Sequence, residues 1–85
     1  MDDEVLLDVS ELEPCEPLER TLDAIKMLQK GDYLRVLHRR EPHLLYQLLE
    51  QGGFSWFTRP GNTSKFEILI WRQGDSSAEN AARAC

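Results

Sequence analysis

Residues 54–72 read FSWFTRPGNTSKFEILIWR, and this stretch decides the class of the fold. In 54–59 and again in 65–72, large apolar residues stand at every second position, which is the period of a β-strand with one better-buried face. The segment between them, PGNTS, combines residue types that favour tight turns. The stretch therefore predicts a β-hairpin, and a sheet against which the rest of the chain packs.

Upstream of the hairpin, strand patterns and helix patterns alternate. Residues 5–9 and 33–38 have β patterns, whereas residues 17–30 and 42–52 carry apolar residues at helical spacing. Each helical segment begins with a proline and ends next to glycine, as is typical of helix termini. The order β-α-β-α-β-β predicts an α/β (α+β) two-layer sandwich, in which two helices cover one face of a mixed four-stranded sheet. The first two strands should be parallel and joined by a right-handed crossover.

A chain of 85 residues has room for one small domain. We expect residues 1–4 to form an acidic lead-in, 5–72 the domain, and 73–85, which contain no large apolar residue, a disordered tail. The apolar stretches are strand-sized, far short of the roughly 18–20 residues of a membrane span, and no secretion signal is visible. The sequence thus predicts a soluble, cytoplasmic protein without membrane contact.

The net charge of −5 is unevenly distributed along the chain. Residues 1–16 hold seven carboxylates and no base, whereas residues 17–72 hold nine bases and six acids. The acidic total disfavours nucleic acid as a partner. We interpret the acidic start as a solvated lead-in to a mildly basic body.

The predicted sheet has a second face without a helix. Strand alternation places a group of apolar side chains there, rimmed by arginine and lysine, and such patches are typical of interfaces. We therefore predict contact with a partner protein or a homodimer through Tyr33, Leu37, Phe57, Leu69 and Trp71. Two alternatives stay open, namely stacking of single-stranded RNA on the aromatic rings and an ordinary half-exposed sheet face.

Candidate chemistry lies at the carboxyl ends of the two parallel strands, where ligands gather in open α/β sheets. The loop after the first strand carries Cys15, and the loop after the second carries His38, Arg39, Arg40, Glu41 and His43. Both loops lead into helix N-termini, which favour anions and ionised thiols. Cys15 is the candidate catalytic nucleophile, although nearby carboxylates oppose its ionisation. The second loop is the candidate anion or ligand site.

The two histidines have three interpretations. Together with Cys15 they can supply three metal ligands, but a spacing of five residues is not a usual ligand pair, so we predict no metal and no cofactor. In the favoured interpretation, His38 and Glu41 form hydrogen bonds in the loop and cap the second helix. The third is a site for a ligand or partner. Cys15 and Cys85 are expected to be free thiols in a reducing compartment.

Two motifs of the chain resemble a known family. Residues 7–18, LDVSELEPCEPL, are similar to the start of the TusA/SirA-like sulfur-carrier superfamily, where the first strand leads to a Cys-Pro-x-Pro motif. The closer resemblance is to an uncharacterised bacterial branch, domain of unknown function 2249, with Glu-Pro-x-Glu-Pro and His-x-x-Glu-Pro-x-x-Leu-Tyr elements. The second element resembles residues 38–46, HRREPHLLY, followed by GFSW at 53–56.

The resemblance implies the two-layer fold and, for the superfamily, a persulfide carried on the motif cysteine and passed on, for example toward tRNA thiolation. Aligned on Glu16 and Pro17, the family cysteine position holds Pro14, and Cys15 is displaced by one residue. We therefore expect a binding or carrier module that acts through protein–protein contacts and is not an enzyme. The alternative is a persulfide carrier, a sulfurtransferase relay on Cys15. Arg39 and Arg40 would then give electrostatic support, and His38 would accept a proton.

Overall fold

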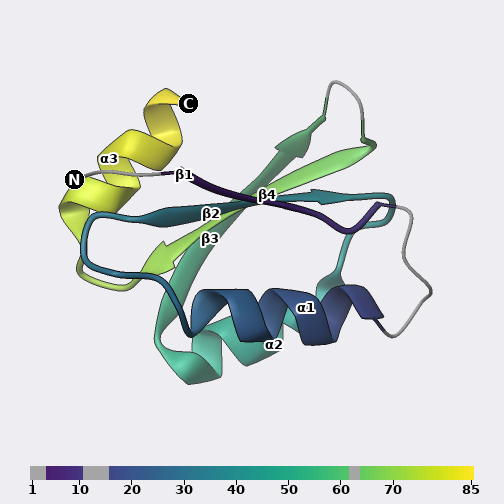
Figure 1. Ribbon diagram of the computed structural model, residues 1–85, viewed down its shortest axis with the longest axis horizontal. Coiled ribbons are helices and arrows are strands. Elements are labelled where there is room, and N and C mark those ends of the chain that lie inside the picture. Colours follow the sequence, from purple (N-terminus) through teal and green to yellow (C-terminus); the bar gives the residue numbers. More distant parts are fainter. Residues whose placement is uncertain (1–3, 11–15, 62–63) are drawn as a thin grey trace.

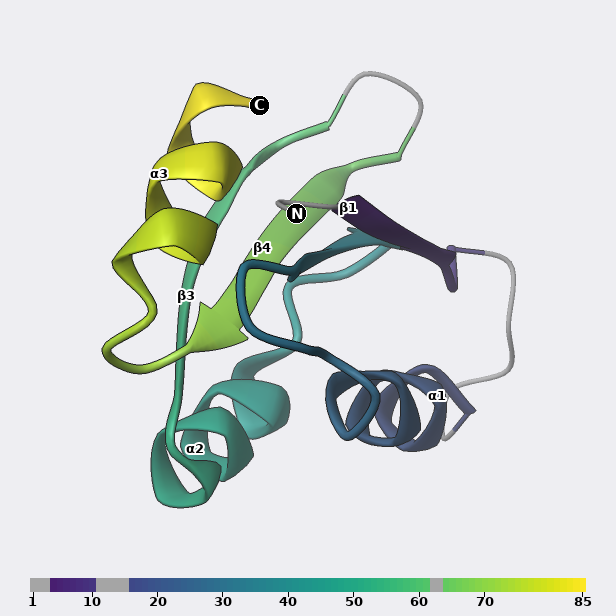
Figure 2. The same cartoon turned by 60° about the vertical axis from the view of Figure 1, so that its left-hand side comes forward.

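The computed structural model describes residues 4–10, 16–61 and 64–85, which form one four-stranded sheet between helices (Figure 1). The order of the strands in the sheet is β1-β2-β4-β3. Helices α1 and α2 lie on one face of the sheet, and α3 lies on the other (Figure 2). The elements in chain order are β1 (Glu4–Asp8), α1 (Glu16–Ile25), β2 (Tyr33–His38), α2 (His43–Gly52), β3 (Phe54–Pro60), β4 (Phe66–Arg72) and α3 (Ser76–Ala84).

The predicted fold class is confirmed, since the sheet is mixed and its first two strands are parallel. β1 pairs with β2 in a register that sets Glu4 opposite Tyr33 and Asp8 opposite Leu37. β3 and β4 form the antiparallel hairpin. β4 also pairs antiparallel with β2, so the second strand of the hairpin lies in the centre of the sheet and β1 and β3 are its edges.

The two predicted helices are present, with one difference in length. α2 ends as expected at Gly53, whose φ of 84° lets its amide reach carbonyls of the last turn. α1 ends at Ile25 instead of near residue 30. Beyond it, the amide of Leu28 bonds only three residues back, to the carbonyl of Ile25, and this tighter turn carries the Leu28 side chain into the core.

The main core fills the space between the sheet and the helices α1 and α2. Alternate residues of the two central strands face the helices: Leu34 and Val36 of β2 and Ile68 and Ile70 of β4 have no exposed surface. The buried members of this cluster are Val9, Ile25, Leu28, Leu34, Val36, Leu45, Leu49, Phe54, Ile68 and Ile70.

Residues 73–85 were predicted to be a disordered tail, and this prediction was wrong, because Ser76–Ala84 form helix α3. Asp75 is the N-cap of α3, where its carboxylate accepts the Ala78 amide at 3.1 Å and the Gly31 amide at 2.7 Å. Ala78 and Ala82 are fully buried against the sheet. Their small side chains let the helix approach the sheet closely, so no large apolar residue is needed for docking.

Helix α3 covers much of the sheet face that was predicted to be an open interface. Tyr33, Leu69 and Trp71 form a second buried cluster with the two alanines, and Phe57 packs against it. Leu37 is buried as well. The guanidinium of Arg83 lies 5.3 Å from the centre of the Phe57 ring and 5.5 Å from the Trp71 ring. This face therefore packs against the protein's own helix.

A buried ionic cluster lies beside α3 on the same face. Glu67, only 2% exposed, receives hydrogen bonds from Arg35 and Arg59, each with a shortest distance of 2.9 Å. These bonds outweigh the effect of burial and hold the pKa of Glu67 below its ordinary value. Arg59 also donates to the Cys85 carbonyl at 2.8 Å, which fastens the end of α3. None of the helices in the described parts of the chain has the length and apolar character needed to cross a bilayer.

Candidate functional site

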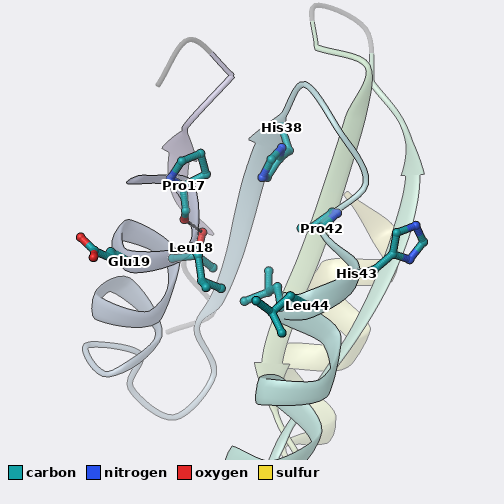
Figure 3. A pocket seen from close by; sticks show the side chains of 9 residues that line it. Pro17, Leu18, Glu19, His38, Pro42, His43 and Leu44 are labelled. Atoms are coloured by element: carbon teal, nitrogen blue, oxygen red, sulfur yellow. Dashed lines mark hydrogen bonds between the residues drawn. The ribbon is translucent and has the colours of Figure 1, made fainter. Parts of the chain in front are cut away.

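A groove of about 500 Å³ opens between the first turns of α1 and α2, where β2 ends (Figure 3). Its size lies within the roughly 300–1,000 Å³ of typical ligand sites. The groove lies at the carboxyl ends of the parallel strands β1 and β2, the end of the sheet at which a ligand site was predicted. The groove is lined by Pro17, Leu18, Glu19, Thr21, His38, Pro42, His43, Leu44 and Leu45.

The walls of the groove come from the two helix starts. In α1, the hydroxyl of the buried Thr21 donates to the carbonyl of Pro17 at 2.7 Å, which satisfies the hydroxyl inside an otherwise apolar wall. In α2, Leu45 points into the core, whereas Leu44 is 59% exposed. The side chains of Leu18 and Leu44 approach the same gap from opposite sides (Figure 3). The walls are therefore predominantly apolar.

His38 contributes a half-buried polar group to the groove. The imidazole extends between Pro17 and Pro42 (Figure 3), and its Nδ1 accepts the backbone amide of Arg40 at 3.1 Å. Burial, together with the charge of Arg39, lowers the pKa of His38 below its ordinary value. The ring is therefore neutral at pH 7 and carries its proton on Nε2. No hydrogen bond from Nε2 is found among the described residues, and this N–H is the donor that the ring can offer to a ligand.

The N-terminus of α2 adds to the donor character of the groove. Pro42 is the N-cap, no side chain caps the helix, and its first turn contains no acidic residue. The partial positive charge of the helix end is thus not compensated on the helix itself. This partial charge and the His38 N–H together favour a ligand that is mostly apolar and carries a hydrogen-bond acceptor.

Comparison with models of known protein families identifies the family of this chain. A family model described as an uncharacterised conserved protein, DUF2249, matches residues 6–72. The chain belongs to the DUF2249 family. The match includes the groove and ends at the last residue of β4, so α3 lies outside it. No curated protein and no solved structure matched.

Glu41 in this DUF2249 domain does not cap α2, contrary to the prediction. Its carboxylate accepts the hydroxyl of Tyr46 at 3.1 Å and lies 3.6 Å from Nε2 of His43. Tyr46 also bonds the hydroxyl of Thr58 and stacks on Trp56 with ring centres 5.3 Å apart. The prediction that His38 forms a hydrogen bond within the loop is confirmed. Glu41 and Tyr46 thus connect the loop through α2 to β3.

The structure brings together only part of the predicted ligand loop. His38 and His43 both line the groove, but the His43 ring points away from its centre (Figure 3). Arg39 and Arg40 are exposed and do not line it. In residues 4–10, 16–61 and 64–85, no three His, Cys, Asp or Glu side chains are grouped as metal ligands. Cys15 lies outside the described residues.

Of the residues that line the groove, sequence reasoning predicted only His38 and His43 as site residues. Two of the residues that it missed are Leu44, which is exposed at the groove, and Tyr46, which bonds Glu41 and does not line the groove. A signal existed for each of them. Leu44 and Leu45 are consecutive, so a helix that buries one must turn the other outward. Glu41 and Tyr46 stand five residues apart within the family motif, a spacing compatible with contact across the start of a helix.

Proposed function

We propose that this DUF2249 domain is a binding module that takes an apolar segment of a partner protein into the groove between α1 and α2. The observation that carries the proposal is the position of the exposed Leu44 at the mouth of a groove whose polar end is the His38 N–H. An inserted segment buries Leu44 and places a carbonyl or carboxylate oxygen on Nε2. Both changes favour the complex.

The chemistry of the groove supports binding more than catalysis. His38 is held as a neutral donor by the Arg40 amide, and its Nδ1 is occupied, so it is not arranged to accept a proton from a ligand. The other polar side chains of the lining either serve the fold, as Thr21 does, or are exposed at the margin, as Glu19 and His43 are.

The test is selection of binding peptides from a random library, followed by mapping with amide and imidazole ¹⁵N NMR. We expect the selected peptides to shift the His38 Nε2 resonance and the amides of Leu18 and Leu44. Leu44→Lys should weaken binding by about tenfold or more, since it places a charge in an apolar contact. Met27→Lys is the matched control, because Met27 is 79% exposed and lies outside the groove. The proposal is contradicted if the selected peptides bind the Leu44→Lys variant as tightly as the wild type.

A second candidate function is persulfide carriage by Cys15. It is supported by the resemblance to TusA/SirA-like sulfur carriers, which we propose as distant relatives, and by the place of Cys15 in the chain, directly before the first residue of α1. In this function the Cys15 thiol attacks a donor persulfide and takes its outer sulfur, and the donor leaves as a thiol. A reducing cytoplasm, the predicted location, suits a free thiol.

Labelling separates the two functions. The protein is incubated with a cysteine desulfurase and radiolabelled cysteine. Label that is lost in Cys15→Ser and kept in Cys85→Ser establishes sulfur carriage. Equal labelling of both variants, or none in the wild type, leaves the binding module as the function.

A further inference from the structure

β1 is an edge of the sheet in which three common protections against pairing, namely a bulge, a lysine and a proline, are absent. It bonds to β2 alone, and no other described strand lies along its outer side. Its register with β2 runs without a bulge from Glu4 to Asp8, and the strand contains neither lysine nor proline. Edge strands of natural proteins are commonly blunted by such features, because their free N–H and C=O groups pair with other chains.

The backbone of β1 offers a hydrogen-bonding residue at its centre. The amide of Val9, just after the strand, donates to the Leu37 carbonyl of β2 at 3.0 Å. Since directions alternate along a strand, the N–H and C=O of Val5 and Leu7 also point toward β2, and those of Leu6 point outward. The Leu6 side chain is 55% exposed. Leu6 is therefore the residue with which an added strand would pair.

Two carboxylates flank Leu6 on the same face of the strand. Glu4 lies 3.6 Å from Arg35, whose guanidinium is closer to Glu67 at 2.9 Å. The Glu4 carboxylate also accepts the hydroxyl of Tyr33 at 3.0 Å and the thiol of Cys85 at 3.2 Å. The Asp8 carboxylate accepts hydrogen bonds from Ser10, and these lower its pKa. The strand also belongs to a stretch, residues 1–16, with seven carboxylates and no base. The edge is thus acidic, with one apolar position between two charges.

We propose that β1 takes an extended basic segment of a partner protein as a fifth strand of the sheet. In an antiparallel pair the residue opposite Leu6 is apolar and those opposite Glu4 and Asp8 are basic, so the segment has the pattern basic-x-apolar-x-basic. A second copy of this chain does not fit, because self-pairing centred on Leu6 sets Glu4 opposite Asp8 twice, and like charges directly opposite are destabilising. The recognition mode is strand addition, in which main-chain hydrogen bonds supply affinity.

This surface is separate from the groove, and the proposal does not depend on the groove's function. β1 lies at the edge of the sheet, whereas the groove lies between the starts of α1 and α2, and no residue of β1 lines it. Binding at one site can therefore be lost by mutation while binding at the other remains.

The test uses a fluorescein-labelled peptide, Gly-Lys-Thr-Leu-Val-Lys-Gly, and fluorescence anisotropy with the full chain at low salt. Two N-methylated versions of the peptide are compared. Methylation of the leucine nitrogen removes the N–H that faces Leu6 and should weaken binding by about tenfold or more. Methylation of the valine nitrogen changes an N–H that points away from β1, and affinity should stay within about twofold. Hydrogen exchange of the Leu6 amide should slow on binding.

Protein variants complete the experiment without disturbing the core. Leu6→Lys places a charge at an exposed edge position and should abolish binding, whereas Leu44→Lys, at the groove, should leave it unchanged. Equal affinity of the two methylated peptides, loss of binding in Leu44→Lys, or absence of binding by the unmethylated peptide would overturn the proposal. So would sedimentation of the free protein as a dimer with a protected Leu6 amide, which would make a second copy the occupant.

Discussion

Glu67 is a single residue on which one side of the sheet depends. Its carboxylate is buried, and the two guanidiniums that neutralise it, Arg35 and Arg59, come from β2 and β3 on either side of β4. Each arginine side chain keeps part of its surface in water, 26% and 30% respectively. The cluster is thus partly solvated, and removal of its negative centre leaves two like charges close together.

We predict that Glu67→Gln lowers the free energy of unfolding by about 2–3 kcal/mol. This is below the cost of breaking a fully buried ion pair, because the arginines remain partly hydrated. The matched control is Glu79→Gln, which breaks an exposed pair with Arg83 within α3 and should cost less than about 0.5 kcal/mol. Urea unfolding followed by fluorescence measures both values. Equal effects of the two variants would contradict the structural role of Glu67.

Glu67 also makes the free energy of unfolding depend on pH. Because the pKa of Glu67 is lowered on folding from its ordinary 4.5, its stabilising effect is complete above about pH 4.5. It is lost as the pH falls through the lower value of the folded state, where the carboxylate takes up a proton. Glu67→Gln should therefore lose stability less steeply than the wild type in acid.

At the scale of elements, the helix α3 is attached at both ends and along one side. Asp75 fixes its start to the loop before β2, the buried alanines fix its middle, and Arg59 holds the carbonyl of Cys85 after its end. Hydrogen bonds from the Gly31 and Ala78 amides lower the pKa of Asp75, because they stabilise the ionised carboxylate that accepts them.

We predict that Asp75→Ala lowers the free energy of unfolding by about 1–2 kcal/mol, since it removes the N-cap of α3 and the acceptor of the Gly31 amide. Asp75→Asn keeps one acceptor oxygen and should fall between the wild type and the alanine variant. Thermal unfolding monitored by far-ultraviolet circular dichroism measures the order. An alanine variant as stable as the wild type would show that α3 does not depend on this cap.

The elements that the sequence predicted are those with local signals. The period of two in residues 54–72 and the prolines before the two helices need no tertiary partner to be recognised. α3 has no such period, because its buried residues are alanines that become a docking face only when an apolar sheet surface lies opposite. An acidic cap residue, alanines of high helix propensity and the pair Glu79 and Arg83 were the available signals.

The position of the groove could be predicted from the sequence because the order of strands and helices determines it. Parallel β1 and β2 carry His38 to the helix starts, and this follows from the order of elements alone. The exclusion of Arg39 and Arg40 from the groove depends on the turn that the His38 ring makes with the Arg40 amide. That turn is a local contact between residues two apart, and it has no periodic pattern in the sequence by which it could be predicted.

For the whole molecule, the order of the strands predicts a gradient of stability. β4 is central and buried along most of its length, whereas β1 and β3 are edges and β1 is largely exposed. We predict that native-state hydrogen exchange is slowest at the amides of Ile68 and Ile70 and fastest, among the strands, in β1. Exchange in β1 as slow as in β4 would show that some other part of the chain covers the edge.

The two cores on opposite faces of the sheet each contain one of the chain's two tryptophans. Trp56 stacks on Tyr46 beside α2, and Trp71 lies under α3 within reach of the Arg83 charge. The indoles are therefore intrinsic fluorophores in two different environments. Replacing either one by phenylalanine leaves a single emitter, so that release of α3 and perturbation of the α2 side can be followed independently, without a dye, in one stopped-flow instrument.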